Sequence, residues 1–329
     1  MVDDMAPGAI RVVLTGPGDP EVLRVEAGPL PVPGRGEVLI RMEAAGVAFN
    51  DITTRQGRNP GKLPLVLGFD VVGVVHAVGP EVTGFRPGQR VAAMVGTGGY
   101  ASHVVARSER VVPIPPHLDP ARVSALVLNY FTAWQMLHRV ADVKAGQSIL
   151  VLGAAGGVGS ALVELAHLVD VRVYGTASAR RHQALEDRGV RVVADQAAVP
   201  ELVDVTFDPV GGPSLARSRK ATRRTGLVVS FGFSFTVDGG HGRALGLLRT
   251  IASLAWAKTL PGSRTTVYTV ESSVARHPAR FQEDLSRLID LLAAGTIQPK
   301  VETMPLVRAA EAHRRLEGRQ VAGKLVLVP

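Results

Sequence analysis

The sequence SILVLGAAGGVGSALVELAHLVDVRVYGTAS occupies residues 148–178 and decides the fold of the chain. Its apolar run at 149–152 is typical of a strand that is buried on both faces of a parallel sheet. Small residues follow at once, and apolar residues then recur at helical spacing from Val158 to Val169. This spacing gives a helix one apolar face to lay on the sheet. The stretch therefore predicts a strand, a tight turn, a helix and a second strand.

The turn between the strand and the helix consists almost entirely of small residues. They are Gly153, Ala154, Ala155, Gly156, Gly157, Val158 and Gly159. Backbone with so few side chains can approach a pyrophosphate, and the positive end of the next helix favours the negative charge. A glycine motif alone often marks only a tight turn, but here a strand precedes it and a helix follows. These seven residues are predicted to bind the phosphates of a dinucleotide.

The end of the second strand indicates which dinucleotide is bound. Folds that bind NAD usually end this strand with an Asp or Glu on the adenosine ribose. Here Ala177 stands about where the acid is expected, and Ser178, Arg180 and Arg181 follow. A hydroxyl and guanidinium groups suit a 2′-phosphate, which a carboxylate would repel. NADPH is therefore the expected cofactor; alternatively, the two arginines only solvate the start of a helix.

Composition limits the function classes that the chain can serve. The 329 residues are 46% hydrophobic and 20% charged, which excludes a disordered protein. The absence of cysteine excludes disulfides, thiolate metal ligands and a cysteine nucleophile. A net charge of +8 raises nucleic acid as a partner, but aromatic residues are only 5% and no RNA-binding motif is present. We expect no nucleic-acid partner, and we expect the basic residues between 217 and 224 to form a solvated helix face.

The N-terminal sequence gives an expectation about location. The N-terminal MVDDMAPGAI is acidic and has no apolar core, so we expect no secretory signal and a cytoplasmic location. The apolar stretch at 244–257, around Trp256, is too short to span a membrane. It is expected to be a pocket wall, a dimer contact or a lipid-facing helix, and no transmembrane segment is expected.

The hydrophobic pattern divides the chain into an α/β part and a β-rich part. Alternating strands with turn-forming glycines and prolines predict a compact β domain before residue 124. Helical periodicity begins near Val123, and strands at 203–208 and 227–231, separated by a helix at 215–224, continue a doubly wound parallel sheet. We expect a catalytic domain at 1–124, a nucleotide-binding domain at 125–270, and a segment at 271–329 that returns to the first domain.

Several segments, in their order and spacing, resemble the medium-chain dehydrogenase/reductase superfamily, specifically its zinc-free quinone oxidoreductase branch and the VAT-1-like group. They are PGRGEVLIRMEAAGV, RQG, GFDVVGVVHAVG, FRPGQRVAAM, GGYASHVV, LVLNYFTAWQML, AAGGVG, FDPVGG, SFGFS and AGKLVLVP. The resemblance implies a GroES-like β-rich catalytic domain, a Rossmann domain, NADPH in the cleft between them, and a homodimer. It also adds cofactor-binding residues: Thr176, Val210, Gly232, Phe233 and Lys324.

The resemblance also shows where this chain departs from its relatives. Zinc-dependent members hold their metal with a Cys and a His at positions that match Ala48 and Phe69 here, and neither residue binds zinc. No metal is therefore expected. Zinc-free members often carry Asn at the position of Ala48 and Tyr near Asn59, and this chain has neither.

Three polar residues are the catalytic candidates that the resemblance implies. Asn50 matches the Ser or Thr that touches the nicotinamide ribose in zinc-dependent relatives, while Tyr130 and Thr132 match residues beside the nicotinamide. Alternatively, Asn50 only holds its loop, and Tyr130 is a core residue with a satisfied hydroxyl. Asp51 is expected to be a hydrogen-bond partner of nearby backbone rather than an acid.

The predicted activity is the NADPH-dependent reduction of a small quinone or α,β-unsaturated carbonyl without zinc. Hydride transfer to a conjugated carbonyl needs no strong acid, because the cofactor carries the chemistry and the protein supplies position. Two alternatives remain. One is a tailoring enzyme of the same fold that catalyses elimination or cyclisation with little redox activity; the other is a VAT-1-like NADPH-binding adaptor at membranes.

Overall fold

The stretch 148–178 folds as the predicted β-α-β unit. It contains β9 (Ser148–Val151), α4 (Gly157–His167) and β10 (Arg172–Gly175). β9 and β10 pair in parallel, and all four residues of β9 are buried. In this computed structural model, residues 8–58, 62–231 and 262–329 are described. The chain divides into two compact units, unit 1 at residues 1–131 and 277–329 and unit 2 at residues 132–276.

Unit 2 is built on a six-stranded parallel sheet. Its further strands are β11 (Arg191–Val192), β12 (Val203–Asp208), β13 (Thr222–Ser230) and β14 (Arg264–Val267). The strand order is β11-β10-β9-β12-β13-β14, with every neighbouring pair parallel. This is the strand order of dinucleotide-binding doubly wound sheets, with β9 and β12 at the point where the order reverses. The predicted α/β Rossmann class is confirmed.

The helices of unit 2 are short where the chain passes between strands. They include α5 (His182–Glu186), α6 (Pro213–Ala221) and α9 (Val270–Arg276). The predicted helix at 215–224 is wrong at its end, because β13 already begins at Thr222. There the side-chain hydroxyl of Thr222 donates to the carbonyl of Ser218 at 2.7 Å, and its backbone is extended. Arg223 and Arg224 consequently lie on a strand.

Unit 1 is the β-rich part. A three-stranded sheet contains β2 (Leu23–Gly28), β1 (Ala9–Leu14) and β4 (Leu65–Val66). A larger sheet runs in the order β15 (Val301–Pro305), β16 (Lys324–Val328), β3 (Glu37–Val47), β5 (Asp70–Val78), β6 (Arg90–Met94) and β8 (Val111–Pro113), and β7 (His103–Arg107) pairs with β3. At Gly73 an added Cβ would lie 2.0 Å from the carbonyl oxygen of Arg41, so only glycine lets β3 and β5 approach this closely.

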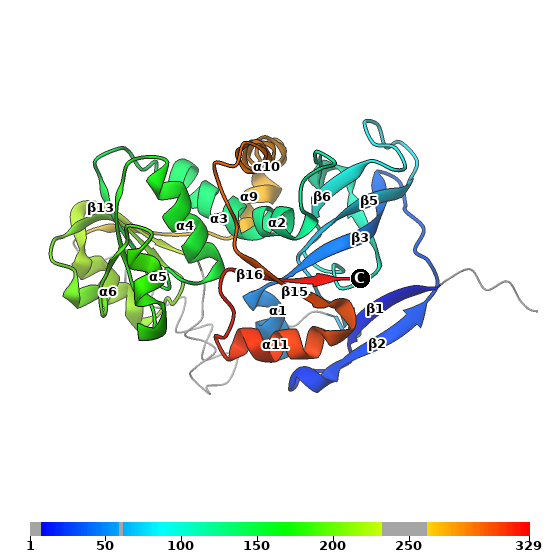
Figure 1. Cartoon of the computed structure of the whole chain (residues 1–329), viewed down its shortest axis with the longest axis horizontal. Helices are drawn as coiled ribbons and strands as arrows, with labels where there is room; N and C mark the ends of the chain where they lie inside the picture. The colour runs from blue at the N-terminus through cyan, green and yellow to red at the C-terminus, as the bar shows by residue number, and fades with distance from the viewer. Residues whose placement is uncertain (1–7, 59–61, 232–261) are drawn as a thin grey trace, which may run out of the picture. The chain divides into compact units, whose positions relative to one another are not determined.

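Two segments far apart in sequence complete unit 1. β16, at the end of the chain, pairs antiparallel with β3, and it pairs parallel with β15 on its other side. α11 (Ala309–Glu317) connects β15 to β16 and packs against both, as Figure 1 shows. α1 (Phe49–Arg55) follows β3 directly and contacts α11. α10 (Pro278–Ala293) buries its apolar face.

A run of helical elements joins the two units along the chain. It consists of α2 (Pro120–Ala125), a π-helical turn η3 (Leu126–Tyr130), α3 (Phe131–Trp134) and a second π-helical turn η4 (Gln135–Val140). α2 is capped by the carboxylate of Asp119, which accepts from the backbone N–H of Ala121 at 3.0 Å. Wide π turns within helices are rare and frequently occur at functional sites. Tyr130 is the last residue of the first one.

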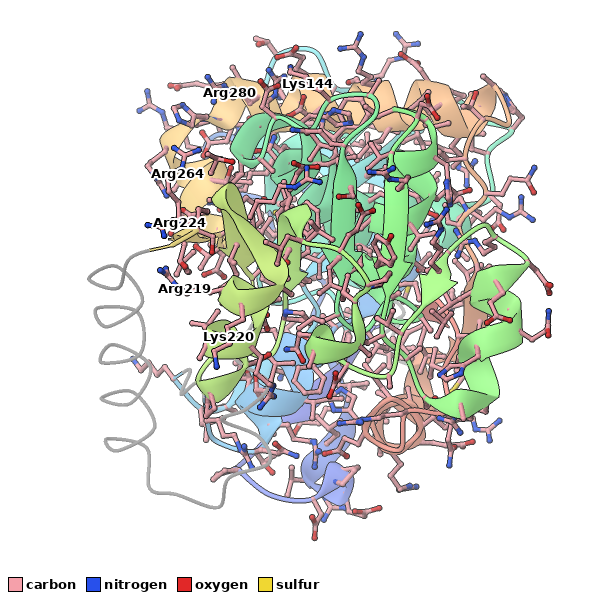
Figure 2. All side chains as sticks on the ribbon, turned by 90° about the vertical axis from the view of Figure 1, so that its left-hand side faces the viewer. Lys144, Arg219, Lys220, Arg224, Arg264 and Arg280 are labelled. Carbon is pink, nitrogen blue, oxygen red and sulfur yellow. The ribbon has the colours of Figure 1, made fainter. Side chains whose placement is uncertain are left out.

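The basic residues between 217 and 224 lie on α6 and β13. Arg217, Lys220 and Arg224 are exposed, whereas Arg219 donates to the Thr265 hydroxyl and Arg223 pairs with Asp204. Figure 2 shows the side chains of Arg219, Arg224 and Arg264 close together beside β13 and β14. An open hollow of about 310 Å³ there is lined by Val140, Leu227, Arg264, Thr265 and Thr266. Most of this charge is therefore solvated or paired, as expected for a charge run.

Some predictions fall outside the part of the chain that the structure describes. Asn59, Gly232, Phe233 and the apolar stretch at 244–257 with Trp256 lie there. Among the helices of the described ranges, none has the length and apolar character needed to cross a bilayer.

Phe281 provides a test of the core of unit 1. Its ring is fully buried and packs edge-on against Phe131, with centroids 5.1 Å apart. Phe281→Ala leaves a cavity, so the free energy of unfolding should fall by about 3–5 kcal/mol, measured by urea denaturation. Val307→Ala, at a side chain that is 55% exposed, is the control and should change stability by no more than about 0.5 kcal/mol. A loss for Phe281→Ala as small as the control's would contradict this packing.

Candidate active site

The turn after β9 has the geometry of a phosphate-binding loop. Gly153 adopts φ +68°, in the left-handed region that favours glycine. A Cβ on Gly159 would lie 2.2 Å from the carbonyl oxygen of Gly153, so this glycine lets the first turn of α4 sit directly on the loop. The first N–H groups of a helix have no acceptors within it, and they attract anions. The residues present therefore fit a pyrophosphate group.

The end of β10 is tied to this turn. The backbone N–H of Gly153 donates to the hydroxyl of Thr176 at 3.1 Å, and the N–H of Ala154 donates to the carbonyl of Thr176 at 2.9 Å. Ser178 then caps a short helical turn, Ala179–Arg181, and its carbonyl accepts from the N–H of Arg181 at 2.8 Å. Ser178 is exposed and Arg181 is half-buried. Both predicted 2′-phosphate residues thus follow the strand that borders the phosphate loop.

A third loop lies at the same edge of the sheet, after β12. Asp208, the last residue of β12, is fully buried, and one carboxylate oxygen accepts from the N–H groups of Val210 and Gly211 at 2.8 and 3.0 Å. Its other oxygen accepts from the hydroxyl of Ser218 at 2.7 Å. The predicted cofactor residue Val210 is therefore held by Asp208. Sequence reasoning missed Asp208, although a carboxylate at the end of a buried strand was a signal for it.

The start of α1 carries the predicted catalytic residue of unit 1. Ala48 caps the helix, and Asn50 lies exposed in its first turn, with its carbonyl accepting from the hydroxyl of Thr53 at 2.9 Å. Ala48 and Phe69 are buried. Their side chains are apolar, so these two positions cannot supply a metal ligand.

Asp51 forms a buried hydrogen-bond network beside Asn50. One oxygen, Oδ2, accepts from the N–H of Ala48 at 2.8 Å and from the hydroxyl of Tyr100 at 3.0 Å; Oδ1 accepts from the N–H of Gly68 at 3.2 Å. The Tyr100 hydroxyl lies 3.2 Å from Nε2 of His313 on α11. Asp51 does bond nearby backbone, as expected, but the sequence did not indicate Tyr100 or His313 as its companions.

Burial shifts the pKa values of this network. It raises the pKa of Asp51 from 3.8 to about 6, against the opposing effects of its hydrogen bonds and of the Lys324 charge. Burial also raises the pKa of Tyr100 well above its usual range. It lowers the pKa of His313 to about 3, and the nearby positive charge of Arg55 adds to this effect. At neutral pH the network therefore holds an ionised carboxylate, a neutral phenol and a neutral imidazole.

Lys324 lies in a second buried network of unit 1. Its ammonium group donates to Asp70 at 3.2 Å, and both side chains are at most 2% exposed. Asp70 also accepts from the N–H of Gly46 at 2.9 Å and the hydroxyl of Ser124 at 2.6 Å. The contact of Lys324 with a cofactor stays a prediction, since the ammonium group is already paired.

The other predicted catalytic residues are buried in the helical run. Tyr130 is 4% exposed at the end of the π-helical turn, and Thr132 is 6% exposed in α3. Asn50 and Tyr130 belong to unit 1 and Thr132 to unit 2, and their common site stays a prediction.

Comparison with known proteins decides the family. An alcohol dehydrogenase GroES-like domain matches residues 34–116, and a zinc-binding dehydrogenase family matches residues 181–327. The human synaptic vesicle membrane protein VAT-1 homolog is 30% identical over 343 residues, covering 97% of this chain and 86% of that protein. The chain belongs to the medium-chain dehydrogenase/reductase superfamily.

Solved structures place this medium-chain dehydrogenase/reductase in the branch of VAT-1 proteins and quinone oxidoreductases. The human VAT-1 homolog-like protein matches with a TM-score of 0.83 at 29% identity, covering 98% of this chain and 99% of that one. Quinone oxidoreductase of Escherichia coli, complexed with NADPH, matches with a TM-score of 0.85 at 25% identity, covering 97% and 100%. The resemblance seen in the sequence is thus confirmed.

The described residues were also compared with the requirements of a metal site. Among residues 8–58, 62–231 and 262–329, no three His, Asp or Glu side chains are grouped so that they could hold a metal ion. The matched family is described as zinc-binding, and independence from zinc stays a prediction that rests on Ala48 and Phe69.

Arg181 tests the 2′-phosphate assignment. Because each hydrogen bond to a charged group contributes about 1.5–3 kcal/mol, Arg181→Ala should weaken NADPH binding by roughly tenfold to a hundredfold. NADH, which has no 2′-phosphate, should bind unchanged. Titration calorimetry with both cofactors measures the two dissociation constants. Arg172→Ala, at the start of β10, where the guanidinium pairs with Glu201, is the control and should affect neither. Equal weakening of both cofactors by Arg181→Ala would refute the assignment.

The Asp51 network predicts an unusual dependence of stability on pH. The raised pKa of Asp51 gives a stabilising contribution that is complete below pH 3.8 and lost as the pH rises through about 6. The lowered pKa of His313 has the opposite effect, because its contribution is present above pH 6.5 and lost as the pH falls toward about 3. The two contributions oppose each other between these limits.

Replacing Asp51 or His313 should therefore reveal the pH dependence of stability that the other residue contributes. Between pH 4 and 6, the unfolding free energy of Asp51→Asn should rise more steeply with pH than that of the wild type, by up to about 1.4 kcal/mol per pH unit. His313→Gln should change the slope in the opposite direction. Urea denaturation across this pH range measures both slopes. If the plots of unfolding free energy against pH were parallel for the wild type and both variants, neither pKa would be shifted as described.

Proposed function

We propose that this protein is a zinc-independent, NADPH-dependent reductase of quinones or α,β-unsaturated carbonyls. The observation that carries the proposal is the phosphate loop after β9, in a sheet whose fold matches that of an NADPH-bound quinone oxidoreductase. The cofactor and the oxidoreductase class follow from membership of this branch. The substrate class is the finer part of the proposal.

The residues of unit 2 suit NADPH in two places. The backbone of the loop from Gly153 to Gly159 would bind the pyrophosphate, because Gly159 allows α4 to begin directly on it. Ser178 and Arg181 would bind the 2′-phosphate through a hydroxyl and a guanidinium group. Thr176 fixes the loop to β10, and Val210 lies at the neighbouring strand end. Gly232, Phe233 and Lys324 complete the proposed set through the family resemblance.

NADPH supplies a hydride from C4 of its nicotinamide when it is bound. The protein must hold the substrate carbonyl oxygen and place a donor against the negative charge that develops on it. Asn50 offers an amide N–H, and Tyr130 and Thr132 offer hydroxyls. Conjugation spreads the charge in a quinone or enone, so one neutral donor suffices. Oxidation of a simple alcohol would instead require removal of a hydroxyl proton, which zinc promotes in relatives. Ala48 and Phe69 stand at the zinc-ligand positions here, and neither side chain can bind zinc.

The remaining expectations belong to the same proposal. The substrate is a small molecule. A homodimer is predicted from the resemblance, and a cytoplasmic location is predicted from the N-terminal sequence.

Asn50 and Tyr130 test the assignment of the donors. Asn50→Ala and Tyr130→Phe should lower turnover by roughly tenfold to a thousandfold, the usual cost of losing one such donor. NADPH affinity should change by no more than a few-fold, because neither residue is assigned to the cofactor. NADPH oxidation followed at its absorbance band, with a panel of quinones and enones, measures turnover. Tyr174→Phe removes another buried tyrosine hydroxyl, which bonds Glu201, and it should leave turnover unchanged.

The same panel tests the reaction class. Activity should persist after washing with a chelator. Turnover of primary alcohols without any reduction of quinones or enones would overturn the proposal, and inactivity on the whole panel would favour the non-redox tailoring enzyme.

A further inference from the structure

A β-bulge in the larger sheet of unit 1 turns His76 away from the core. The pairing of β5 with β3 shifts by one residue between Val75 and Ala77, so His76 is an extra residue without a partner on β3. Bulges of this kind bend a strand and re-aim a side chain, and they are frequent next to functional sites. Val75 is buried in the core, whereas the neighbouring His76 is exposed. The bulge therefore presents an imidazole to solvent.

A second imidazole reaches the same face from another strand. Arg41 of β3 pairs with Val74 of β5 on one side and with His103 of β7 on the other, so β3 lies between these two strands. The rings of His76 and His103 nevertheless meet, with their centres 5.2 Å apart and their planes at 83°. His103 is half-buried. Two histidines from different strands thus form a pair on one face of the sheet.

The separation of the two rings is that of two imidazoles on one metal ion. A zinc ion lies about 2.0–2.1 Å from a ligating imidazole nitrogen, and hence roughly 3.2 Å from the centre of the ring. At the tetrahedral angle that zinc adopts, two such ring centres are about 5.2 Å apart. The distance between the rings of His76 and His103 agrees with this value. Because both residues lie on paired strands, the sheet holds their backbones at the required spacing.

Ser102 orients the ring of His103. Its hydroxyl oxygen accepts from the backbone N–H of Ile10 at 2.9 Å and lies 3.2 Å from Nδ1 of His103. A hydroxyl oxygen has two acceptor lone pairs, so it can also accept from Nδ1–H. Nε2 then carries a lone pair, and a hydrogen bond of this kind from the second nitrogen is usual in metal-binding histidines. Within the described part of the chain, neither imidazole has another hydrogen-bond partner.

Arg41 is a charged neighbour that opposes a cation at this place. It lies directly opposite His103 in the pairing of β3 with β7, and its side chain is exposed. Water and salt screen the repulsion between exposed charges. The charge of Arg41 should therefore weaken the binding of a cation without preventing it.

We propose that His76 and His103 bind a divalent transition-metal ion such as Zn²⁺, each through one ring nitrogen, with water in the remaining positions. Imidazole suits Zn²⁺, Ni²⁺ and Cu²⁺, whereas Mg²⁺ takes oxygen ligands. This site is not that of the zinc-dependent relatives, whose ligand positions hold Ala48 and Phe69 here. The inference is independent of the proposed function, which uses no metal.

Titration calorimetry of Zn²⁺ into chelator-washed protein tests the site. The wild type should bind one ion per chain more tightly than any further ions. His76→Ala and His103→Ala should each weaken this binding by at least about tenfold, because one of two protein ligands is lost. His117→Ala removes an exposed histidine of the same unit and, as the control, should leave the binding unchanged. Mg²⁺ should not compete.

Two further measurements separate the loss of a ligand from a loss of folding. Arg41→Gln removes the opposing charge and should tighten Zn²⁺ binding by about two- to fivefold, a gain that misfolding cannot produce. Zn²⁺ should also raise the resistance of the wild type to urea, since the ion binds the folded form. His76→Ala should show no such increase.

Each result supports or overturns the proposal. Zn²⁺ binding that His76→Ala and His103→Ala leave unchanged would overturn it, and so would a wild type that binds Zn²⁺ no more tightly than these variants. A loss as large in His117→Ala would show that scattered histidines hold the ion, which also contradicts the site. The titrations use neither NADPH nor a quinone, so failure of the proposed function would leave their result intact.

Discussion

The contact between Gly159 and the carbonyl of Gly153 is the constraint on which the cofactor-binding part depends. Any side chain at Gly159 would collide with that carbonyl, so α4 can begin on the loop only because none is present. The loop is in turn bonded to Thr176 at the end of β10, and β9 pairs with β12, whose last residue, Asp208, organises the next loop. The ends of β9 and β10 thus meet at the loop that this close approach shapes, and the loop after the neighbouring β12 is held separately by Asp208.

Local pattern was sufficient to predict this part of the fold. A buried strand, small turn residues and a helical apolar face are all readable within thirty residues, because each depends on neighbours in sequence. The end of α6 was predicted wrongly for the same reason. The hydroxyl of Thr222 bonds the carbonyl of Ser218, and Thr222 already belongs to the strand that pairs with β12. The pattern of charged residues indicates neither contact. The polar networks of unit 1 were beyond such reasoning. Tyr100 and His313 are 213 residues apart, and nothing local marks them as partners.

Unit 1 contains two buried carboxylates with different partners. Asp70 has a full positive charge beside it in Lys324, together with Gly46 and Ser124 as donors. Asp51 has only neutral hydrogen-bond donors, and its pKa rises on burial. Asp70 is thus a compensated ion pair that ties β16 to β5, whereas Asp51 keeps its charge at a cost.

The return of the chain to unit 1 has a consequence for how the protein is made. Unit 2 is one continuous segment, whereas unit 1 needs its last strand, β16, to cover β3. Pairing between Val47 and Leu325 closes a very long loop, and non-local pairing of this kind is slow to form. On the ribosome, unit 2 can complete its sheet as it emerges, since domains fold as units during synthesis. The edge of β3 at residues 45–47 must wait, open to wrong partners, until β16 has been synthesised and can pair with it.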